Sequence, residues 1–198
     1  MYDFVFGFAL GLLMPFLSVF VLQDIEGGTL KVAGLAFTAY WVARLVTTIP
    51  FSRFMDRTDG ERDEFYFMVI GTALVATLIL FYIWASKPWH IYLIQALIGI
   101  ANSMAVPGWR ILFTDHLDKG KVGLEWSFDD VVIGLATAAS AYLGGVIAEK
   151  YGFDTLFIVI SILSYLGAII LIPAWKNIKK KPKEIDRLGV PTKVQSTI

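Results

Sequence analysis

One arginine inside an apolar stretch is the residue with the clearest chemical potential in this sequence. Arg44 follows Tyr40 by four residues and precedes Thr47 and Thr48, so on a helix these polar side chains share one face. It lies 12 residues before Asp56, which is about 18 Å along a helix. A cation at that depth in an apolar segment is costly, and it usually faces water, a ligand or a counter-charge. Arg44 is therefore predicted to bind an anionic solute or to act in coupling, and Tyr40 on the same face is predicted to bind solute. The alternative for Arg44 is a structural ion pair or hydrogen bonds to carbonyls.

A second polar face is predicted further along the chain. Gln95, Asn102 and Trp109 recur at intervals of seven residues, so they lie along one side of a helix. Asn102 is near the middle of its apolar stretch, where the amide can hydrogen-bond a solute or a neighbouring helix. Asn102 is therefore a candidate for binding solute, and helix packing is the alternative.

Two adjacent carboxylates open a later apolar stretch. Asp129 and Asp130 follow Glu125-Trp126-Ser127-Phe128 near the start of a predicted helix. A carboxylate there can interact with the helix N-terminus, or it can face a cavity and bind a proton or cation. Adjacent residues point about 100° apart on a helix, so one of the two is expected to do so, and we prefer Asp130.

The elements that position these residues are predicted to be membrane helices. The chain has 198 residues, of which 57% are hydrophobic and 17% charged. Soluble domains carry roughly 25% charged residues, so this chain has too little polar surface for a water-soluble globule. About 20 apolar residues in a helix cross a hydrocarbon core of about 30 Å.

Six apolar runs meet that requirement. They are residues 4–22, 33–54, 65–84, 89–113, 127–148 and 153–174. Strands of a membrane barrel would instead be about ten residues long and would alternate in polarity. The sequence therefore predicts an all-α membrane protein, with a six-helix bundle over residues 1–175 and a basic tail over 176–198.

Lysine and arginine predict the orientation in the membrane. If the N-terminus is cytoplasmic, the outer segments hold only Lys31, Lys87 and Lys150, and apart from Arg44 the other basic residues fall on the cytoplasmic side. Cytoplasmic loops are enriched in such residues. We therefore expect a multi-pass protein of the cell membrane with both termini in the cytoplasm.

Several function classes are disfavoured by composition. The net charge is zero, so no global attraction to nucleic acid is expected. Cysteine is absent and the two histidines, His90 and His116, are far apart, which argues against a metal site. An intramembrane serine protease would need a G-x-S-x motif and a histidine within the membrane, which the sequence lacks. No enzyme activity and no cofactor are predicted.

Three stretches together resemble the major facilitator superfamily. The join SRFMDRTDGER at residues 52–62 is similar to the signature loop G-x-L-a-D-R-x-G-R-R/K of that family, with Ser52 in place of its first glycine and one additional residue before Gly60. Residues 95–107 resemble the fourth helix of the family, with Gln95 where arginine is usual. This resemblance implies a helix that lines the cavity, so Gln95, Asn102 and Trp109 are expected to bind solute. Residues 143–157 resemble the end of its fifth helix, without the Gly-Pro pair of the antiporter form.

The resemblance implies a transport function and a gate. In the family the signature loop joins the two six-helix halves on the cytoplasmic side, so Asp56 is expected to meet the N-terminus of the fifth helix in the other half. Arg57 and Arg62 are expected to reach Asp115, Asp129 or Asp130. These contacts would hold the cytoplasmic side closed while the cavity opens outward.

The length implies an incomplete transporter. The family has two six-helix halves related by an axis along the membrane normal, and this chain supplies one. We therefore expect a second copy as partner in a parallel homodimer of twelve helices, surrounded by membrane lipid. The predicted function is secondary transport of a small-molecule substrate, with proton coupling as an option. The alternatives are one half of a larger or heteromeric transporter, and a non-transporting scaffold.

Overall fold

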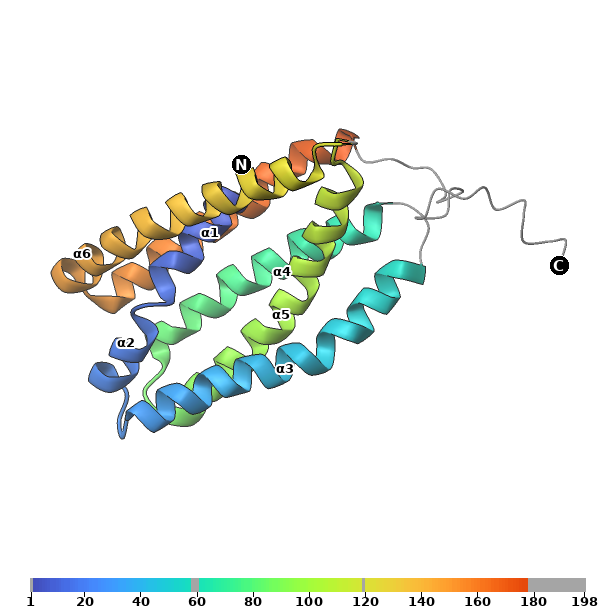
Figure 1. Cartoon of the computed structure of the whole chain (residues 1–198). Coiled ribbons are helices and arrows are strands. Elements are labelled where there is room, and N and C mark those ends of the chain that lie inside the picture. Colours follow the sequence, from blue (N-terminus) through green and yellow to red (C-terminus); the bar gives the residue numbers. More distant parts are fainter. Residues whose placement is uncertain (1, 58–60, 119, 178–198) are drawn as a thin grey trace, which may run out of the picture.

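The computed structural model describes residues 2–57, 61–118 and 120–177, and all regular structure in these ranges is helical (Figure 1). The elements are α1 (Tyr2–Leu13), α2 (Leu17–Asp24), α3 (Leu30–Arg57), α4 (Arg62–Leu80), η1 (Phe81–Trp84), α5 (Pro88–Asp115), α6 (Val122–Leu171) and η2 (Ile172–Asn177). The predicted all-α class is confirmed for these ranges. The predicted tail lies outside them except for its first two positions, which belong to η2.

Five segments of the described chain are long and apolar enough to cross a membrane. They are Gly7–Asp24, Leu30–Arg57, Arg62–Trp84, Pro88–Asp115 and Val122–Leu171. The first four correspond to the first four predicted runs. The predicted runs 127–148 and 153–174 both lie in α6, which is a single element of 50 residues.

A single glycine divides α6 into two arms. Gly152 has φ 81° and ψ 170°, a conformation outside the helical region that residues with a Cβ rarely adopt. The first arm (122–151) and the second arm (153–171) therefore run in different directions, and Figure 1 shows α6 turning back on itself. This turn coincides with the short polar join predicted between the fifth and sixth runs.

The first predicted run is also interrupted, at a proline. Helix α1 ends at Leu13 and α2 begins at Leu17, so Pro15 lies in the turn between them. A proline restricts the residue before it and cannot donate a backbone hydrogen bond, so helices commonly break there. The chain therefore crosses this region as two short helices rather than one rod.

The helices pack in a consistent order. Helix α1 packs on α6, α3 packs on α5, and α4 lies between α5 and α6 (Figure 1). The seam between α4 and the second arm is tied by the Ser161 hydroxyl, which donates to the Ala76 carbonyl at 2.8 Å. The α3–α5 seam holds Tyr40, Arg44 and Asn102, three of the residues singled out from the sequence.

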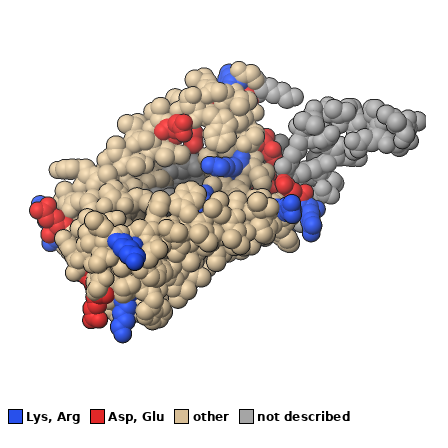
Figure 2. Space-filling view, turned by 60° about the horizontal axis from the view of Figure 1, so that its bottom comes forward, with Lys and Arg blue, Asp and Glu red and all other residues tan. Residues whose placement is uncertain are grey.

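The outer surface of the bundle is mostly apolar. Figure 2 shows uncharged side chains over most of one face, with charged groups occurring singly or in small sets. Large apolar side chains such as Leu45, Val46 and Leu135 are largely exposed. In water such a surface would favour association, whereas in a bilayer hydrocarbon covers it.

Candidate functional site

A polar network crosses the seam between α3 and α5. The Tyr40 hydroxyl accepts a hydrogen bond from Arg44 Nη1 at 2.8 Å and another from Asn102 Nδ2 at 3.2 Å. Tyr40 is 5% exposed and Asn102 is 3% exposed, so both lie inside the bundle. The structure thus brings together three of the five predicted solute-binding residues, and we call Tyr40, Arg44 and Asn102 the seam network.

The close approach of the two helices positions this network. Gly99 on α5 lies directly against the Tyr40 carbonyl, and a Cβ built on Gly99 would be 3.3 Å from the Arg44 nitrogen. The neighbouring Ser103 hydroxyl lies 2.7 Å from the Thr47 hydroxyl and donates to the Gly99 carbonyl at 2.9 Å. Small residues allow such close helix contacts, and hydroxyls then bridge them.

Arg44 is held in place without a counter-charge. Its guanidinium carbon lies 5.1 Å from the centre of the Trp41 ring and 5.8 Å from that of Tyr40, distances typical of cation–π contacts. The side chain is partly buried near the midpoint of α3, and it forms no ion pair with any described residue. A guanidinium has five N–H donors, and one of them is used by Tyr40. The others are available for water or an anion.

Asn102 carries an unmet hydrogen-bond requirement. Its Oδ1 atom is fully buried and has no hydrogen-bond partner among the described residues, although its Nδ2 donates to Tyr40. A buried polar atom without a partner costs about 1–3 kcal/mol, so such atoms in native proteins call for an explanation.

The other two predicted solute-binding residues lie apart from this network. Trp109 stacks on Phe113 with ring centres 5.3 Å apart, and its centre is 5.9 Å from that of Trp126 on α6. It therefore belongs to an aromatic cluster joining the end of α5 to the start of α6. Gln95 is buried on α5 and makes no hydrogen bond with the seam network.

The predicted gate residues lie at helix ends and are largely exposed. Asp56 and Arg57 close α3, and Asp115 closes α5. Arg62 begins α4, where its guanidinium carbon lies 5.4 Å from the centre of the Trp175 ring. The signature positions 58–60, including Gly60, lie outside the described residues.

The predicted coupling residues differ in their surroundings. On the first arm of α6, Asp129 is partly buried and Asp130 is exposed. The two carboxylates are close enough to repel each other. Asp130, the preferred candidate from the sequence, is thus the more solvated of the pair in the isolated chain.

Comparison with known proteins identifies the family. A sequence model described as Major Facilitator Superfamily matches residues 3–195. The chain belongs to the major facilitator superfamily. It is therefore a multi-pass membrane protein of a transporter family, as the three resembling stretches predicted.

Relatives within the superfamily differ in length. The chain is 24% identical over 164 residues to the uncharacterised MFS-type transporter YitZ of Bacillus subtilis (strain 168), covering 83% of this chain and 96% of YitZ. It is 21% identical over 164 residues to the multidrug resistance protein MdtG of Enterobacter lignolyticus (strain SCF1), covering 81% of this chain and 38% of MdtG. For MdtG of Salmonella newport (strain SL254), the identity is 20% over 181 residues, or 90% of this chain and 43% of MdtG. The chain thus spans nearly all of YitZ and under half of MdtG.

Two members of the site were not predicted from the sequence. Trp41 supports the Arg44 guanidinium through its ring, and Ser103 bridges the two helices through its hydroxyl. Ser103 follows Asn102 directly, and Trp41 follows Tyr40, so neither lies on the polar face that the spacing emphasised. The presence of an aromatic ring beside a lone arginine was the available signal for Trp41.

Proposed function

We propose that this chain is one half of a secondary transporter, which moves a small solute across the cell membrane by alternating access. Two copies inserted in parallel, with both termini in the cytoplasm, would form a twelve-helix assembly around a central path. The bias of lysine and arginine toward one side supports parallel insertion. Membership of a transporter family supports the transport function.

The seam network is the observation that carries this proposal. An arginine near the middle of a membrane helix, with donors available and no acidic partner among the described residues, is a costly arrangement for structure alone. The unsatisfied Asn102 oxygen lies in the same network. We infer that Arg44 binds an acidic or polar group of the solute while Asn102 accepts a hydrogen bond from it.

Alternating access needs contacts that differ between states. We propose that Asp56 contacts the N-terminus of the partner copy's first arm near Ser127 when the cytoplasmic side is closed. Arg57 and Arg62 would then face Asp115, Asp129 or Asp130 across the same junction. Asp129 and Asp130 are the candidates for coupling to protons, because an opening between the copies would change their hydration.

Two measurements on the purified chain test the proposed assembly: its native mass and its transport activity. The purified chain is expected to give twice its monomer mass in native mass spectrometry and to catalyse uptake after reconstitution into liposomes. A monomer that transports would contradict the dimer, and a dimer inactive toward a broad solute panel would favour a scaffold. Activity that appears only after a second, different six-helix chain is added would favour a heteromeric transporter.

Replacing Asp56 with asparagine is expected to slow uptake about two- to fivefold without lowering the unfolding temperature. The reason is that a carboxylate at a helix N-terminus contributes about 0.3–1 kcal/mol. Its loss changes the ratio of the closed to the open cytoplasmic state by the corresponding factor. The measurement is the initial rate of uptake into liposomes.

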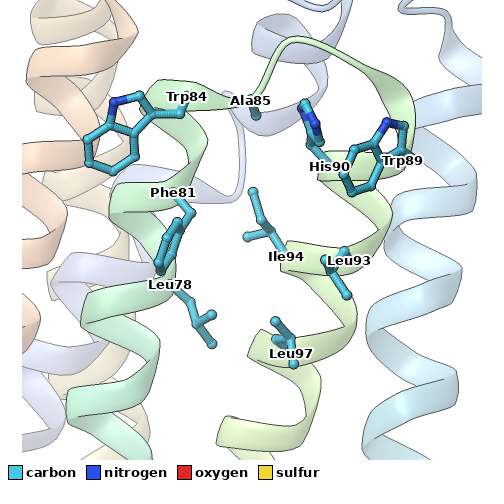
Figure 3. A pocket seen from close by; sticks show the side chains of 9 residues that line it. All are labelled: Leu78, Phe81, Trp84, Ala85, Trp89, His90, Leu93, Ile94 and Leu97. Atoms are coloured by element: carbon cyan, nitrogen blue, oxygen red, sulfur yellow. The ribbon is translucent and has the colours of Figure 1, made fainter.

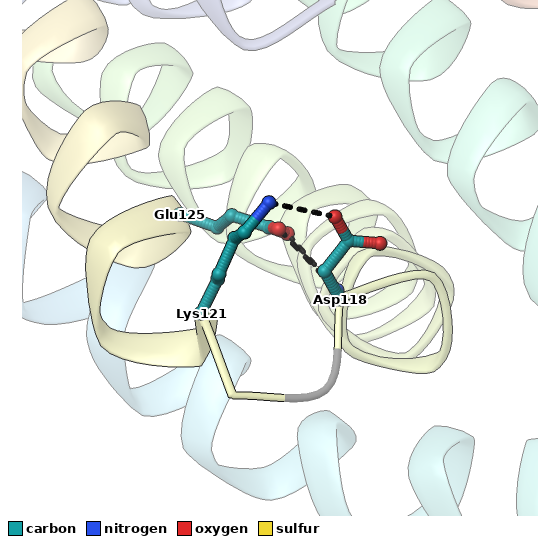
Figure 4. A network of polar contacts seen from close by, with 3 residues as sticks. All are labelled: Asp118, Lys121 and Glu125. Atoms are coloured by element: carbon teal, nitrogen blue, oxygen red, sulfur yellow. Dashed lines mark hydrogen bonds and ion pairs between the residues drawn. The ribbon is translucent and has the colours of Figure 1, made fainter.

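A matched control for this variant lies in the loop before α6. Asp118 is exposed, pairs with Lys121 at 3.7 Å, and its backbone N–H donates to Glu125 at 3.3 Å (Figure 4). Such surface pairs are worth about 0–1 kcal/mol, so Asp118→Asn is expected to leave uptake unchanged. Equal rates for the two variants would contradict a gating role for Asp56.

A further inference from the structure

An apolar pocket opens between α4 with η1 on one side and α5 on the other. Its volume is about 330 Å³. Figure 3 shows Leu78 and Phe81 facing Leu93 and Leu97 across it, and the chain from Trp84 to Trp89 arching over one end. The pocket is separate from the seam network, since it shares no residue with it.

The position of this pocket defines how an occupant reaches it. Both walls belong to segments long and apolar enough to cross a membrane, Arg62–Trp84 and Pro88–Asp115, and the pocket lies at the ends of those segments. Trp84 is 69% exposed and Trp89 is 58% exposed. Tryptophan favours the boundary between hydrocarbon and headgroups, so this end of the pocket is at headgroup level. An occupant of these apolar walls would have an apolar chain.

The chain that closes one end of the pocket carries a hydrogen-bond donor in the lining residue His90 and a positive charge in Lys87, whose backbone lies beside the His90 ring. His90 Nδ1 accepts hydrogen bonds from the backbone N–H groups of Ser86, at 3.1 Å, and Lys87, at 3.3 Å. In the neutral ring the proton is then on Nε2, which has no partner among the described residues. The Lys87 side chain is exposed and forms no ion pair with a described residue. These groups complement an anion.

We propose that this pocket binds an anionic phospholipid, with one acyl chain between α4 and α5 and the phosphate beside Lys87 and His90. Apolar walls alone would accept any acyl chain. The exposed Lys87 adds a preference for headgroups with net negative charge, because opposite charges at the membrane surface attract each other. Lipid binding at this pocket does not depend on the proposed transport function, because the pocket shares no residue with the seam network.

The test compares ligands that share only part of this chemistry. The full-length chain, purified in detergent and delipidated, is titrated with phosphatidylglycerol, with phosphatidylcholine of the same acyl chains, and with glycerol 3-phosphate. Native mass spectrometry gives the retained lipid, and thermal unfolding gives the stabilisation. Phosphatidylglycerol is expected to bind about fivefold more tightly than phosphatidylcholine, and glycerol 3-phosphate is expected not to bind.

Variants separate the two parts of the proposed site. Leu93→Trp fills the pocket and is expected to weaken both lipids at least tenfold, whereas Lys87→Gln is expected to remove only the preference for phosphatidylglycerol. Ile162→Trp, at an exposed position on the second arm of α6, is the matched control and should change neither affinity. If Leu93→Trp lowers stability in the absence of lipid, Ala85→Leu is used instead, because Ala85 lines the closed end of the same pocket.

Two results would overturn the proposal. Unchanged lipid retention in both pocket-filling variants would show that the acyl chain binds elsewhere. Equal affinity for the two lipids in the unmodified chain, or binding of glycerol 3-phosphate as tight as that of phosphatidylglycerol, would refute recognition of an anionic lipid.

Discussion

The Arg44→Gln variant is expected to fold normally and to lose about ten- to a hundredfold in affinity for the transported solute. Hydrogen bonds from a charged group contribute about 1.5–3 kcal/mol, which corresponds to that range. Glutamine retains a donor that can reach toward Tyr40, so the α3–α5 seam should survive the change. The loss should therefore appear in binding and uptake rather than in stability.

A thermal-shift screen measures this effect and finds the solute in the same experiment. Carboxylates, phosphorylated compounds and lipophilic cations are first screened against the unmodified chain, because a ligand that binds the native form raises the unfolding temperature by an amount that grows with the ratio of its concentration to its Kd. The compounds that give a shift are then tested on Arg44→Gln. Arg53→Gln is the matched control, since Arg53 is an exposed cation on the same helix. If Arg44→Gln kept the full shift, the site assigned to Arg44 would be wrong.

The second large effect is expected on stability, from Gly99→Val. Gly99 lies against the Tyr40 carbonyl, and a Cβ added to it would be 3.3 Å from the Arg44 backbone nitrogen. Any side chain at this position therefore forces α3 and α5 apart. Overpacking of this kind typically costs about 1–3 kcal/mol, and here it also separates Asn102 from the Tyr40 hydroxyl. We expect a destabilisation near the upper end of that range and loss of solute binding.

The control for this variant is another helical glycine with free space around it. Gly134 on α6 has no atom within 4 Å of the position of a Cβ, so Gly134→Val makes the same chemical change without a clash in the isolated chain. Unfolding temperature and yield in detergent are compared for the two variants. Equal stability of the two would show that the α3–α5 approach does not depend on glycine.

The pairing of Tyr40 with Arg44 was predictable because it depends only on spacing within one helix. The turn at Gly152 was visible as the short polar join between two apolar runs, whereas the helix break at Pro15 was not predicted, because the sequence predicts residues 4–22 as one run. These features depend on local backbone chemistry. Composition and run length then sufficed for the membrane class.

Contacts between helices were less accessible from the sequence. Asn102 and Trp109 were predicted to act together because both lie on one face of α5, yet Asn102 contacts α3 and Trp109 contacts α6. Spacing defines a face of one helix, but which neighbour covers each part of that face depends on crossing angle and register. Ser103 was missed for the same reason, since its role arises only where Gly99 brings the helices together.

The single-residue turn at Gly152 has a mechanical consequence. Since no flexible linker separates the two arms of α6, an axial shift of one arm pulls directly on the other. Helix α1 packs along this helical hairpin, so α1 and the two arms of α6 are expected to move as one unit. The turn between Leu13 and Leu17 is then the nearest point at which α2 can change its angle relative to this unit.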